Sequence, residues 1–485
     1  MNQDDPNNRT PQEAEDPAEP TVDTEDAGEI DPASLERSAK AVAPVDLDEP
    51  LASLMNTNFI EFASYVVKDR AIPELYDGLK PVQRRILHTM WVMDDGRFHK
   101  VANVIGQAMQ YHPHGDRSIG DALVVLANKE CFIDRQGNFG NIQTGDVAAA
   151  ARYIECRLSP LAREVLFNAE ITEFVDSYDG RNREPVVLPS KIPTVLLLGA
   201  EGIAVTLATS ILPHNFNELL DAQIAILEGR PFSCHPDFPT AGIMDVSDYD
   251  DGRGKVRVRA RVDIVDDKTI VIREVPASVT TERLMSSIED AVKRGKIKIA
   301  AINDYTAEQV EIEIKLPRGT HADEVVRQLY AYTKCEVSLT SNIVVIDNNH
   351  PCEMTVSEIL HKVTERLVDT LGRELEIDLR RLQEKFQQKT LAQLFIEHRL
   401  YKRIEECETD VAVRQAVRDG LRPYRHLLPR DISGEDVERL LELKIRRISR
   451  FDIAANRRDL EEILPTLEQT WKQQRNLVSY AIHYV

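Results

Sequence analysis

The feature that most constrains the fold is an apolar repeat of helical spacing that runs from Val356 onward. Its apolar positions recur every three or four residues, at Ile359, Val363, Leu367, Leu371, Leu375, Leu379, Leu382 and Phe386. A similar run near the C-terminus comprises Leu460, Ile463, Leu467 and Trp471. Two long helices that bracket a small helical segment near 395–450 predict an antiparallel coiled-coil arm with a globular tip. A plain helical bundle is the ordinary alternative.

Such an arm has consequences for assembly and for its own geometry. Two helices have little core of their own, which favours a symmetric dimer. Pro465 lies in the return helix, and we expect a kink there because proline lacks an N–H group and clashes with the preceding turn.

Strands mixed with helices are expected ahead of the arm, from about 181 to 353. Residues 255–264 alternate apolar side chains with mostly basic ones, which is typical of a strand with one basic face. Residues 268–276 and 310–317 are expected to form further strands. The basic face is either a solvated sheet surface or a patch that faces DNA.

Length and composition favour a cytosolic protein of about three domains. The chain has 485 residues, an acidic, polar start and no long uncharged apolar run, so we expect a soluble cytoplasmic protein without a membrane partner. Its six cysteines include no Cys-x-x-Cys pair, which argues against a structural zinc site.

The charge is concentrated in one tail. Residues 1–50 hold 15 acidic and three basic side chains, a net charge of −12 out of −21 for the whole chain. This segment has almost no aromatic residues, and its composition predicts disorder. The remainder is only mildly acidic, which allows a local basic groove.

The first folded segment is expected to begin near Leu51 with an amphipathic helix, with Arg70 on its polar side or just past its end. The Asp77-Gly78 turn and Pro81 then predict the start of a second helix. We expect that helix to bury Val82, Ile86, Met90 and Met93 and to expose Lys80, Arg84 and Arg85. A third helix, burying Val101, Val104, Ile105, Ala108 and Met109, makes a helix-turn-helix possible.

Two histidines one residue apart, His112 and His114, open the sequence His-Pro-His-Gly-Asp. Histidines and a carboxylate at alternate positions suggest a metal site. However, Arg117 stands where a further ligand is needed, and a cation beside a metal ion is unfavourable. The alternative is that the imidazole N–H groups donate to phosphate oxygens, with no metal in this chain. A metal-dependent hydrolase remains the weaker hypothesis.

Tyr153 lies in a segment with two arginines, Arg152 and Arg157. A free phenol titrates near pH 10 and is a poor nucleophile at neutral pH. Nearby guanidiniums favour the phenolate and can hold a phosphate by paired hydrogen bonds. A half-buried tyrosine packed against an arginine is the commoner meaning of such a pair, so the pair alone assigns no function.

Five motifs occur in order: Arg70-Ala-Ile-Pro, Asp77-Gly-Leu-Lys-Pro-Val-Gln-Arg-Arg, Tyr111-His-Pro-His-Gly-Asp, Asp134-Arg-Gln-Gly-Asn-Phe-Gly and Ala150-Ala-Arg-Tyr-Ile-Glu-Cys-Arg-Leu. Together they closely resemble the A subunit of bacterial type IIA DNA topoisomerases, the family formed by the A subunits of DNA gyrase and DNA topoisomerase IV. The resemblance continues through Gly202-Ile-Ala-Val and Pro213-His-Asn. It covers everything after the acidic tail and is strongest from about 55 to 260.

The resemblance implies a nucleophile and its helpers. Tyr153 would attack a DNA phosphodiester and form a transient phosphotyrosyl enzyme, and resealing would be the same reaction in reverse. Arg152 would stabilise the charge that develops on the phosphoryl oxygens. The implied DNA and phosphate contacts are Arg70, Lys80, Arg84, His112 and His114.

The resemblance also implies an architecture of mixed α/β and α domains. The acidic tail at 1–50 would precede a winged-helix DNA breakage-reunion domain at 51–180. An α/β tower domain at 181–353 would flank the bent DNA. A coiled-coil arm with a helical dimer gate would occupy 354–485.

At two further positions the resemblance implies a specific role. Ile211 aligns with the apolar wedge that relatives insert between base pairs to bend DNA, and Thr206-Leu207 replace the usual Gly-Met nearby. Arg117 replaces a serine or threonine that, with the retained Asp121, anchors a drug-bound metal ion through water in the family. We therefore expect weak fluoroquinolone sensitivity.

The implied activity is ATP-dependent passage of one duplex through another, with a role in chromosome segregation at the nucleoid. ATP and Mg²⁺ would both be bound by a separate B subunit, in an A₂B₂ assembly around a homodimer of this chain. Relatives usually carry a DNA-wrapping domain after the arm; its absence here favours relaxation or decatenation, as in topoisomerase IV. The alternatives are a gyrase-type protein without wrapping, and a DNA-binding or bridging homologue without strand passage.

Overall fold

The computed structural model describes residues 51–405, 407–443 and 450–485. The tail at 1–50, for which we expected disorder, lies outside the described residues. The chain divides into one unit from Met1 to Glu61 and another from Phe62 to Val485, and helix α2 (Leu51–Val66) crosses that division. Within the described part of the chain, every helix is too short or too polar to traverse a bilayer.

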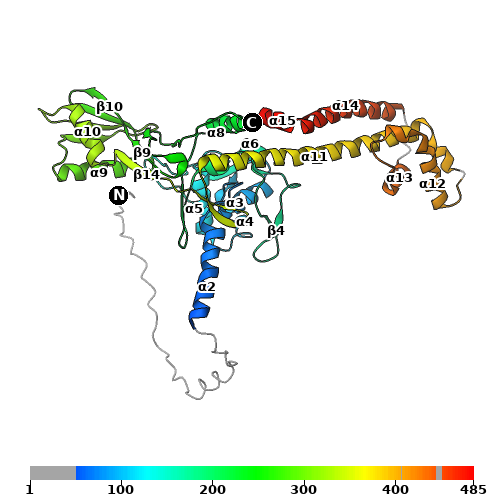
Figure 1. Cartoon of the computed structure of the whole chain (residues 1–485), viewed down its shortest axis with the longest axis horizontal. Helices are drawn as coiled ribbons and strands as arrows, with labels where there is room; N and C mark the ends of the chain where they lie inside the picture. The colour runs from blue at the N-terminus through cyan, green and yellow to red at the C-terminus, as the bar shows by residue number, and fades with distance from the viewer. Residues whose placement is uncertain (1–50, 406, 444–449) are drawn as a thin grey trace, which may run out of the picture. The chain divides into compact units, whose positions relative to one another are not determined.

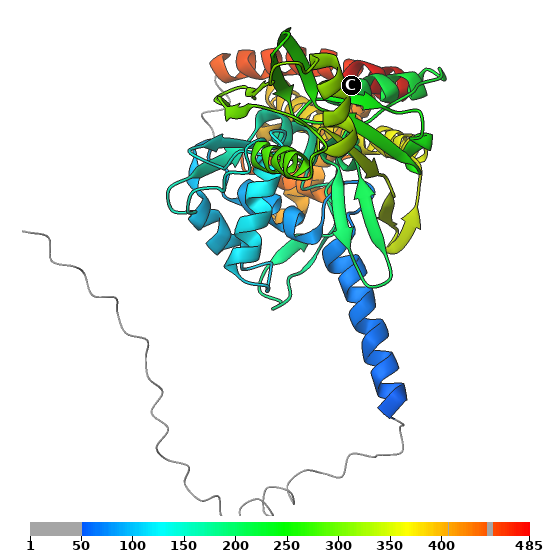
Figure 2. The same cartoon turned by 90° about the vertical axis from the view of Figure 1, so that its left-hand side faces the viewer.

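Three helices and a small sheet build the first core of the larger unit (Figures 1 and 2, blue to cyan). The helices are α3 (Pro81–Val92), α4 (Val101–Ala108) and α5 (Asp116–Ala127). The sheet is antiparallel, with β3 (Glu155–Leu158) between β1 (His99–Lys100) and β2 (Ile133–Gln136). The predicted apolar face of α4 is confirmed except at Met109, which is 42% exposed because the helix ends at Ala108.

A second core holds the chain that follows this sheet. It packs a β-hairpin and helix α8 (Phe216–Leu227) against the start of the long helix α11 (Val356–Glu397). The hairpin consists of β6 (Ala200–Ile203) and β7 (Ala208–Ile211). The shorter elements before α8 are α6 (Pro160–Leu166), β4 (Phe174–Asp176), β5 (Arg183–Pro185) and α7 (Thr194–Leu198).

The strand expected at 255–264 is two strands that belong to different sheets. β9 (Lys255–Arg259) lies between β8 (Ile243–Asp245) and β14 (Glu336–Thr340), whereas β10 (Arg261–Asp266) is the edge of a four-stranded sheet. The break falls at Ala260, whose N–H donates to the Cys335 carbonyl at 2.8 Å. The four-stranded sheet continues with β11 (Thr269–Glu274), β13 (Ile312–Lys315) and β12 (Ala301–Asp304).

Two of the three basic side chains of β9 pair with acidic neighbours. Arg257 pairs with Asp245 at 2.7 Å, and Arg259 pairs with Glu336 at 2.5 Å. These pairs favour the solvated-surface interpretation over a DNA-facing patch. Helices α9 (Thr281–Lys293) and α10 (Ala322–Tyr332) share a core with the four-stranded sheet, and β15 (Val344–Asp347) pairs with β16 (His350–Glu353) just before the arm.

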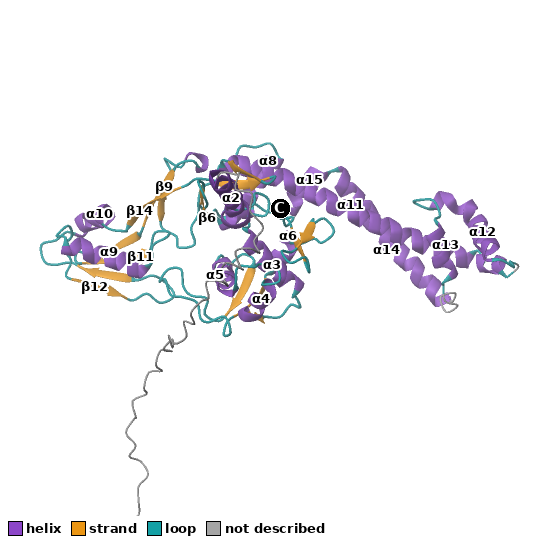
Figure 3. Cartoon of the chain, turned by 90° about the horizontal axis from the view of Figure 1, so that it is seen from below, coloured by secondary structure: helices purple, strands orange, loops and turns teal. Residues whose placement is uncertain are grey.

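The two long helices predicted from the apolar repeats are confirmed. α11 runs from Val356 to Glu397, and α14, from Arg450 to Arg475, packs along it (Figures 1 and 3). Thr355 starts α11 with a capping box, in which its side chain accepts from the Glu358 N–H and the Glu358 carboxylate accepts from the Thr355 N–H. Helix α14 continues through Pro465, and the expected kink stays a prediction. A short final helix, α15 (Leu477–Tyr484), packs back against α11 and α8.

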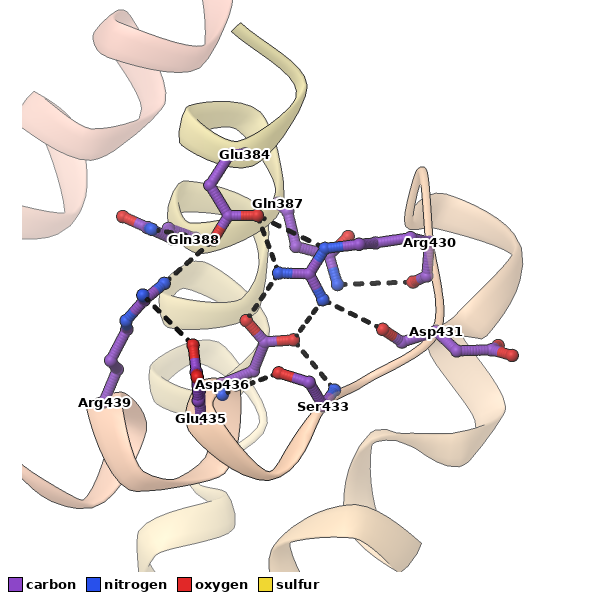
Figure 4. Close-up of polar contacts among 9 residues, drawn as sticks. All are labelled: Glu384, Gln387, Gln388, Arg430, Asp431, Ser433, Glu435, Asp436 and Arg439. Atoms are coloured by element: carbon purple, nitrogen blue, oxygen red, sulfur yellow. Dashed lines mark hydrogen bonds and ion pairs between the residues drawn. The ribbon is translucent and has the colours of Figure 1, made fainter. Parts of the chain in front are cut away.

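A small helical head lies between α11 and α14, as the spacing predicted. Its α-helices are α12 (Asp410–Leu421) and α13 (Gly434–Leu441). Arg430 fastens the head to α11 by donating to Asp436 of α13 at 2.6 Å and to Glu384 of α11 at 2.7 Å (Figure 4). Arg439 donates to the same Glu384 at 2.8 Å. One carboxylate of the long helix therefore receives two guanidiniums from the head.

Candidate active site

Tyr153 stands at the end of a tight turn that leads directly into the central strand β3. Its N–H donates to the Ala150 carbonyl at 2.9 Å, and the next side chain, Ile154, is buried in the first core. The phenol itself is 64% exposed. The structure therefore does not show the half-buried tyrosine that is the commoner meaning of an Arg-Tyr pair.

The first turn of α4 holds this tyrosine turn in place. The N–H of Val101 donates to the Ile154 carbonyl at 3.0 Å, and the N–H of Ala102 donates to the Ala151 carbonyl at 3.1 Å. The first N–H groups of a helix have no partner within the helix, so these bonds satisfy two of them. The turn that carries Tyr153 is thus tied both to a helix start and to the middle of a sheet.

Arg152 covers the face of the tyrosine ring. Its guanidinium carbon lies 4.5 Å from the ring centroid, a distance typical of a cation–π contact. Arg152 is exposed, and no acidic side chain of the described residues pairs with it. Arg157, by contrast, is occupied elsewhere, because it pairs with Asp134 at 2.9 Å. Only one of the two expected guanidiniums therefore accompanies the phenol.

His112 is buried and held by a charged pair. Arg85 donates to Nδ1 of His112 at 3.1 Å and binds the Glu184 carboxylate at 2.5 and 3.0 Å. Because a guanidinium can only donate, Nδ1 is the acceptor and the ring proton lies on Nε2. Burial lowers the His112 pKa to about 4, with further lowering by Arg85 and His114. His112 is therefore a neutral donor at neutral pH.

His114 is exposed and lies beside His112, with the ring centroids 5.0 Å apart in an edge-to-face arrangement. Its Nε2 contacts the hydroxyl of Tyr65. Among the described residues, no group of three or more histidine, cysteine, aspartate or glutamate side chains is placed to hold a metal ion. The donor role expected of the two histidines stays a prediction.

Arg70 and Lys80 occupy different surroundings. Arg70 is exposed in a π-helical turn, Val67–Ala71. Lys80 is half-buried and donates from Nζ to the Glu201 carbonyl of β6 at 2.6 Å. Burial lowers the Lys80 pKa, while the Glu201 carboxylate opposes that shift. Lys80 therefore ties the start of α3 to the β6–β7 hairpin.

Arg84 was expected to be exposed, and that expectation is wrong. Its residue exposure is 8%, and it forms a paired ion bridge with Asp77, with bonds of 2.5 and 3.0 Å. Asp77 is fully buried and also accepts from the Leu79 and Leu188 N–H groups. Because a buried carboxylate needs such partners, Arg84 organises the turn before α3 rather than offering its guanidinium to solvent.

The position of Ile211 is also incompatible with a role as the DNA wedge. Its exposure is 2%, and its side chain belongs to the second core. In the hairpin register Ile211 pairs with Ala200 at the base, whereas Ile203 pairs with Ala208 near the tip. Ile203 is 88% exposed, which makes it the apolar side chain that the hairpin presents. The signal was already present in Gly202-Ile-Ala-Val.

The hairpin tip carries the Thr206-Leu207 departure. Thr206 has a φ of +67°, a left-handed conformation that is unusual for a β-branched residue. Relatives were expected to have glycine here, which adopts this conformation without strain. Leu207 packs against the small cluster that contains Val67 and Ala71. The hairpin turn therefore forms with threonine at this position, and Thr206 bears backbone strain.

Arg117 and Asp121 lie together on the exposed side of α5. Their charged atoms are 3.9 Å apart, and the side chains are 94% and 78% exposed. The carboxylate of Asp121 thus has a cation of its own chain close by.

The candidate site falls into two parts within one chain. One part holds Tyr153 and Arg152, and the other holds His112 and His114. No hydrogen bond, ion pair or ring contact within the described residues joins the two parts. Sequence reasoning missed the residues that orient the second part, which are Tyr65, Arg85 and Glu184.

Comparison with known proteins identifies the class to which this fold and site belong. The family model for the A subunit of DNA gyrase/topoisomerase IV matches residues 70–483. The chain therefore belongs to the DNA gyrase/topoisomerase IV A-subunit family, which confirms the resemblance drawn from the motifs.

Individual relatives agree with this assignment. The DNA topoisomerase 4 A subunit of Borreliella burgdorferi is 47% identical over 435 residues, which are 90% of this chain and 70% of that protein. The DNA gyrase A subunit of Escherichia coli is 35% identical over 377 residues, which are 72% of this chain and 42% of that protein. The DNA gyrase A subunit of Mycobacterium tuberculosis is 33% identical over 493 residues and is matched over 56% of its length.

Proposed function

We propose that this chain is the DNA-cleaving component of an ATP-dependent type II DNA topoisomerase. The observation that carries the proposal is the exposed Tyr153 phenol, held on a rigid turn with the Arg152 guanidinium over its ring. A tyrosine displayed in this way is suited to nucleophilic attack. The 47% identity to a topoisomerase 4 A subunit exceeds the 33–35% identity to the gyrase A subunits, and the match spans 70% of that relative against 42–56% of the gyrase subunits. These differences favour a topoisomerase IV-like role in relaxation or decatenation.

In the proposed reaction, the Tyr153 oxygen attacks a DNA phosphorus and releases the neighbouring deoxyribose oxygen. The phosphodiester is exchanged for a phosphotyrosyl ester, and the freed hydroxyl reverses the exchange to reseal the strand. Arg152 stabilises the negative charge on the phosphoryl oxygens during transfer. His112, His114 and Arg70 hold the DNA backbone near the scissile bond, while Lys80 and Arg84 maintain the structure around them.

The proposed site is completed by other chains. A B subunit would contribute the ATPase and Mg²⁺, and the metal ion would neutralise charge at the phosphate. The separation of Tyr153 from the histidine pair fits a symmetric dimer in which the two parts meet across chains. The assembly would be A₂B₂, acting on the nucleoid DNA of the cytoplasm.

The finer architecture follows the same proposal. The three-helix core around β3, spanning 51–180, would be the winged-helix cleavage domain. The sheets at 181–353 would form the tower that flanks the DNA, and 354–485 would form the coiled-coil arm and dimer gate. Ile203, in place of Ile211, would be the wedge that unstacks a base step and bends the cleaved duplex.

A decatenation assay tests the proposal. The chain is mixed with candidate B subunits, ATP, Mg²⁺ and catenated DNA circles, alongside Tyr153→Phe. ATP-dependent unlinking that disappears in Tyr153→Phe supports the proposal. DNA binding without unlinking or covalent adduct, unchanged in Tyr153→Phe, supports a bridging homologue instead. Cleavage by the chain alone with added transition metal supports a metal hydrolase.

A further inference from the structure

The contact between Tyr65 and His114 joins two anchored segments that are 49 residues apart in the sequence. Tyr65 lies in the last turn of α2, and the next residues, Val66 and Val67, are buried. His114 is steadied through its backbone, because the Ser118 hydroxyl donates to the His114 carbonyl at 3.1 Å. The ring centroids of Tyr65 and His114 are 6.1 Å apart. Both rings are therefore placed by the fold.

We propose that Tyr65 is a positioning residue that sets the tautomer of His114; the inference rests on the proposed function. In this proposal the phenol hydroxyl is the donor to Nε2 of His114, which places the ring proton of the neutral tautomer on Nδ1. No described residue makes a hydrogen bond with that Nδ1. The Nδ1–H group is thus kept for an acceptor from outside the chain, which the proposed function identifies as a DNA phosphate oxygen.

The neighbouring histidine, His112, is held in the other neutral tautomer. Arg85 donates to Nδ1 of His112, which leaves its proton on Nε2. The two imidazoles therefore hold complementary tautomers in edge-to-face contact, each with one N–H group that no described residue uses. A phosphate has several acceptor oxygens and can receive both donors at once. The two histidines thus offer the DNA backbone two N–H donors, one from each ring.

The tautomer is measured directly on the chain alone, labelled with ¹⁵N-histidine, by long-range proton–nitrogen correlation near neutral pH. Assignment uses His114→Gln, which removes the His114 signals. The expected result is a protonated Nδ1 on His114 in the wild type, with loss of that preference in Tyr65→Phe. A proton on Nε2 in the wild type, or an unchanged tautomer in Tyr65→Phe, overturns the proposal. This readout needs no topoisomerase activity, so it is independent of the proposed function.

A double-mutant cycle tests the consequence for DNA cleavage in the reconstituted complex with the B subunit. Tyr65→Phe is expected to slow covalent adduct formation about tenfold, the value of one hydrogen bond, with DNA affinity little changed. His114→Gln should slow it further, and adding Tyr65→Phe to His114→Gln should have no additional effect. The proposal is contradicted if the effects of the two substitutions on the rate of adduct formation multiply in the double variant. It is also contradicted if Tyr65→Phe forms the adduct at the wild-type rate.

Tyr305→Phe is the matched control for this cycle. Tyr305 is 59% exposed, and its hydroxyl makes no hydrogen bond with the described residues. Tyr305→Phe should form the covalent adduct at the same rate as the wild type. If the wild type itself forms no adduct, the proposed function fails while the tautomer measurement still decides the role of Tyr65.

Discussion

Gly202 passes so close to Ala71 that a β-carbon at position 202 would lie 2.1 Å from the Ala71 carbonyl oxygen. Gly202 belongs to β6, and Ala71 ends the π-helical turn that carries Arg70. The close approach docks the β6–β7 hairpin, with its exposed Ile203, against the turn beside it. Only glycine permits this approach, because the obstructing atom is backbone and cannot rotate away.

Gly202→Ala should displace the hairpin and lower the free energy of unfolding by about 1–3 kcal/mol, as overpacking does elsewhere. The urea midpoint measures this change, and DNA bending in the reconstituted complex should weaken with it. Gly106→Ala is the control, because a β-carbon there meets nothing within 4 Å in helix α4. That substitution should raise stability by about 0.5–1 kcal/mol. An unchanged midpoint in Gly202→Ala would refute the docking argument.

Arg85→Met should remove the donor that fixes His112 while preserving side-chain volume. His112 would then populate both neutral tautomers, and its pKa should rise, although burial still keeps it below the ordinary value. We expect slower DNA cleavage, by about tenfold, with only a small loss of DNA affinity. The measurement is adduct formation at several pH values between 5 and 8. A rate and pH profile identical to the wild type would show that Arg85 does not act through His112.

His214 predicts how stability depends on pH. It is 3% exposed beside the Tyr249 hydroxyl, and burial lowers its pKa to about 4. Since the unfolded histidine titrates near 6.5, the unfolded state binds an extra proton between these values. Stability is then lost as the pH falls from 6.5 toward 4, by about 2 kcal/mol between pH 7 and pH 5.

Glu74 contributes to the pH dependence of stability with the opposite sign. Burial raises its pKa to about 7, so on acidification the folded chain binds this proton at a higher pH than the unfolded chain does. The test is therefore the difference between the wild type and His214→Gln in urea unfolding at pH 7 and pH 5. The variant should be less stable at pH 7 but should lose less stability on acidification. Equal pH dependence in the two proteins would contradict the assignment.

Arg117→Ser should restore a hydroxyl acceptor and free Asp121 from its cation, which lies 3.9 Å away. The fluoroquinolone concentration that traps half of the cleavage complexes should fall about tenfold or more, the value of one hydrogen bond. Arg117→Lys keeps the charge and should stay insensitive. Ordinary drug-trapped breaks in the wild type would show that Arg117 does not block the drug.

The long arm was predictable because its signal is local. Leu367 and Leu371 are buried at the spacing of a helix, and the sequence alone records that spacing. The buried face of the return helix was predicted less well, since Trp471 is 44% exposed despite its place in the apolar run. Periodicity predicts that a helix exists better than it predicts which residue is covered.

The errors at Arg84 and Ile211 have a different physical origin. The exposure of Arg84 depends on Asp77, which reaches it across the turn before α3, and nothing in helical spacing reports that pairing. The exposure of a hairpin residue depends on its distance from the base, so Ile211 is buried and Ile203 is presented at the tip. The motifs likewise located Tyr153, but the α4 amides that hold its turn come from a segment about 50 residues earlier.

The proposed cleavage by Tyr153 is tested most directly by the chemical identity of the residue that becomes joined to DNA. The chain, a B subunit and Mg²⁺ are incubated with a labelled duplex, denatured rapidly and digested with protease, and the labelled peptide is sequenced by mass spectrometry. We predict one phosphotyrosyl adduct, on Tyr153, and no adduct in Tyr153→Phe. A cleaved duplex with no adduct, or an adduct on any other residue, would contradict it.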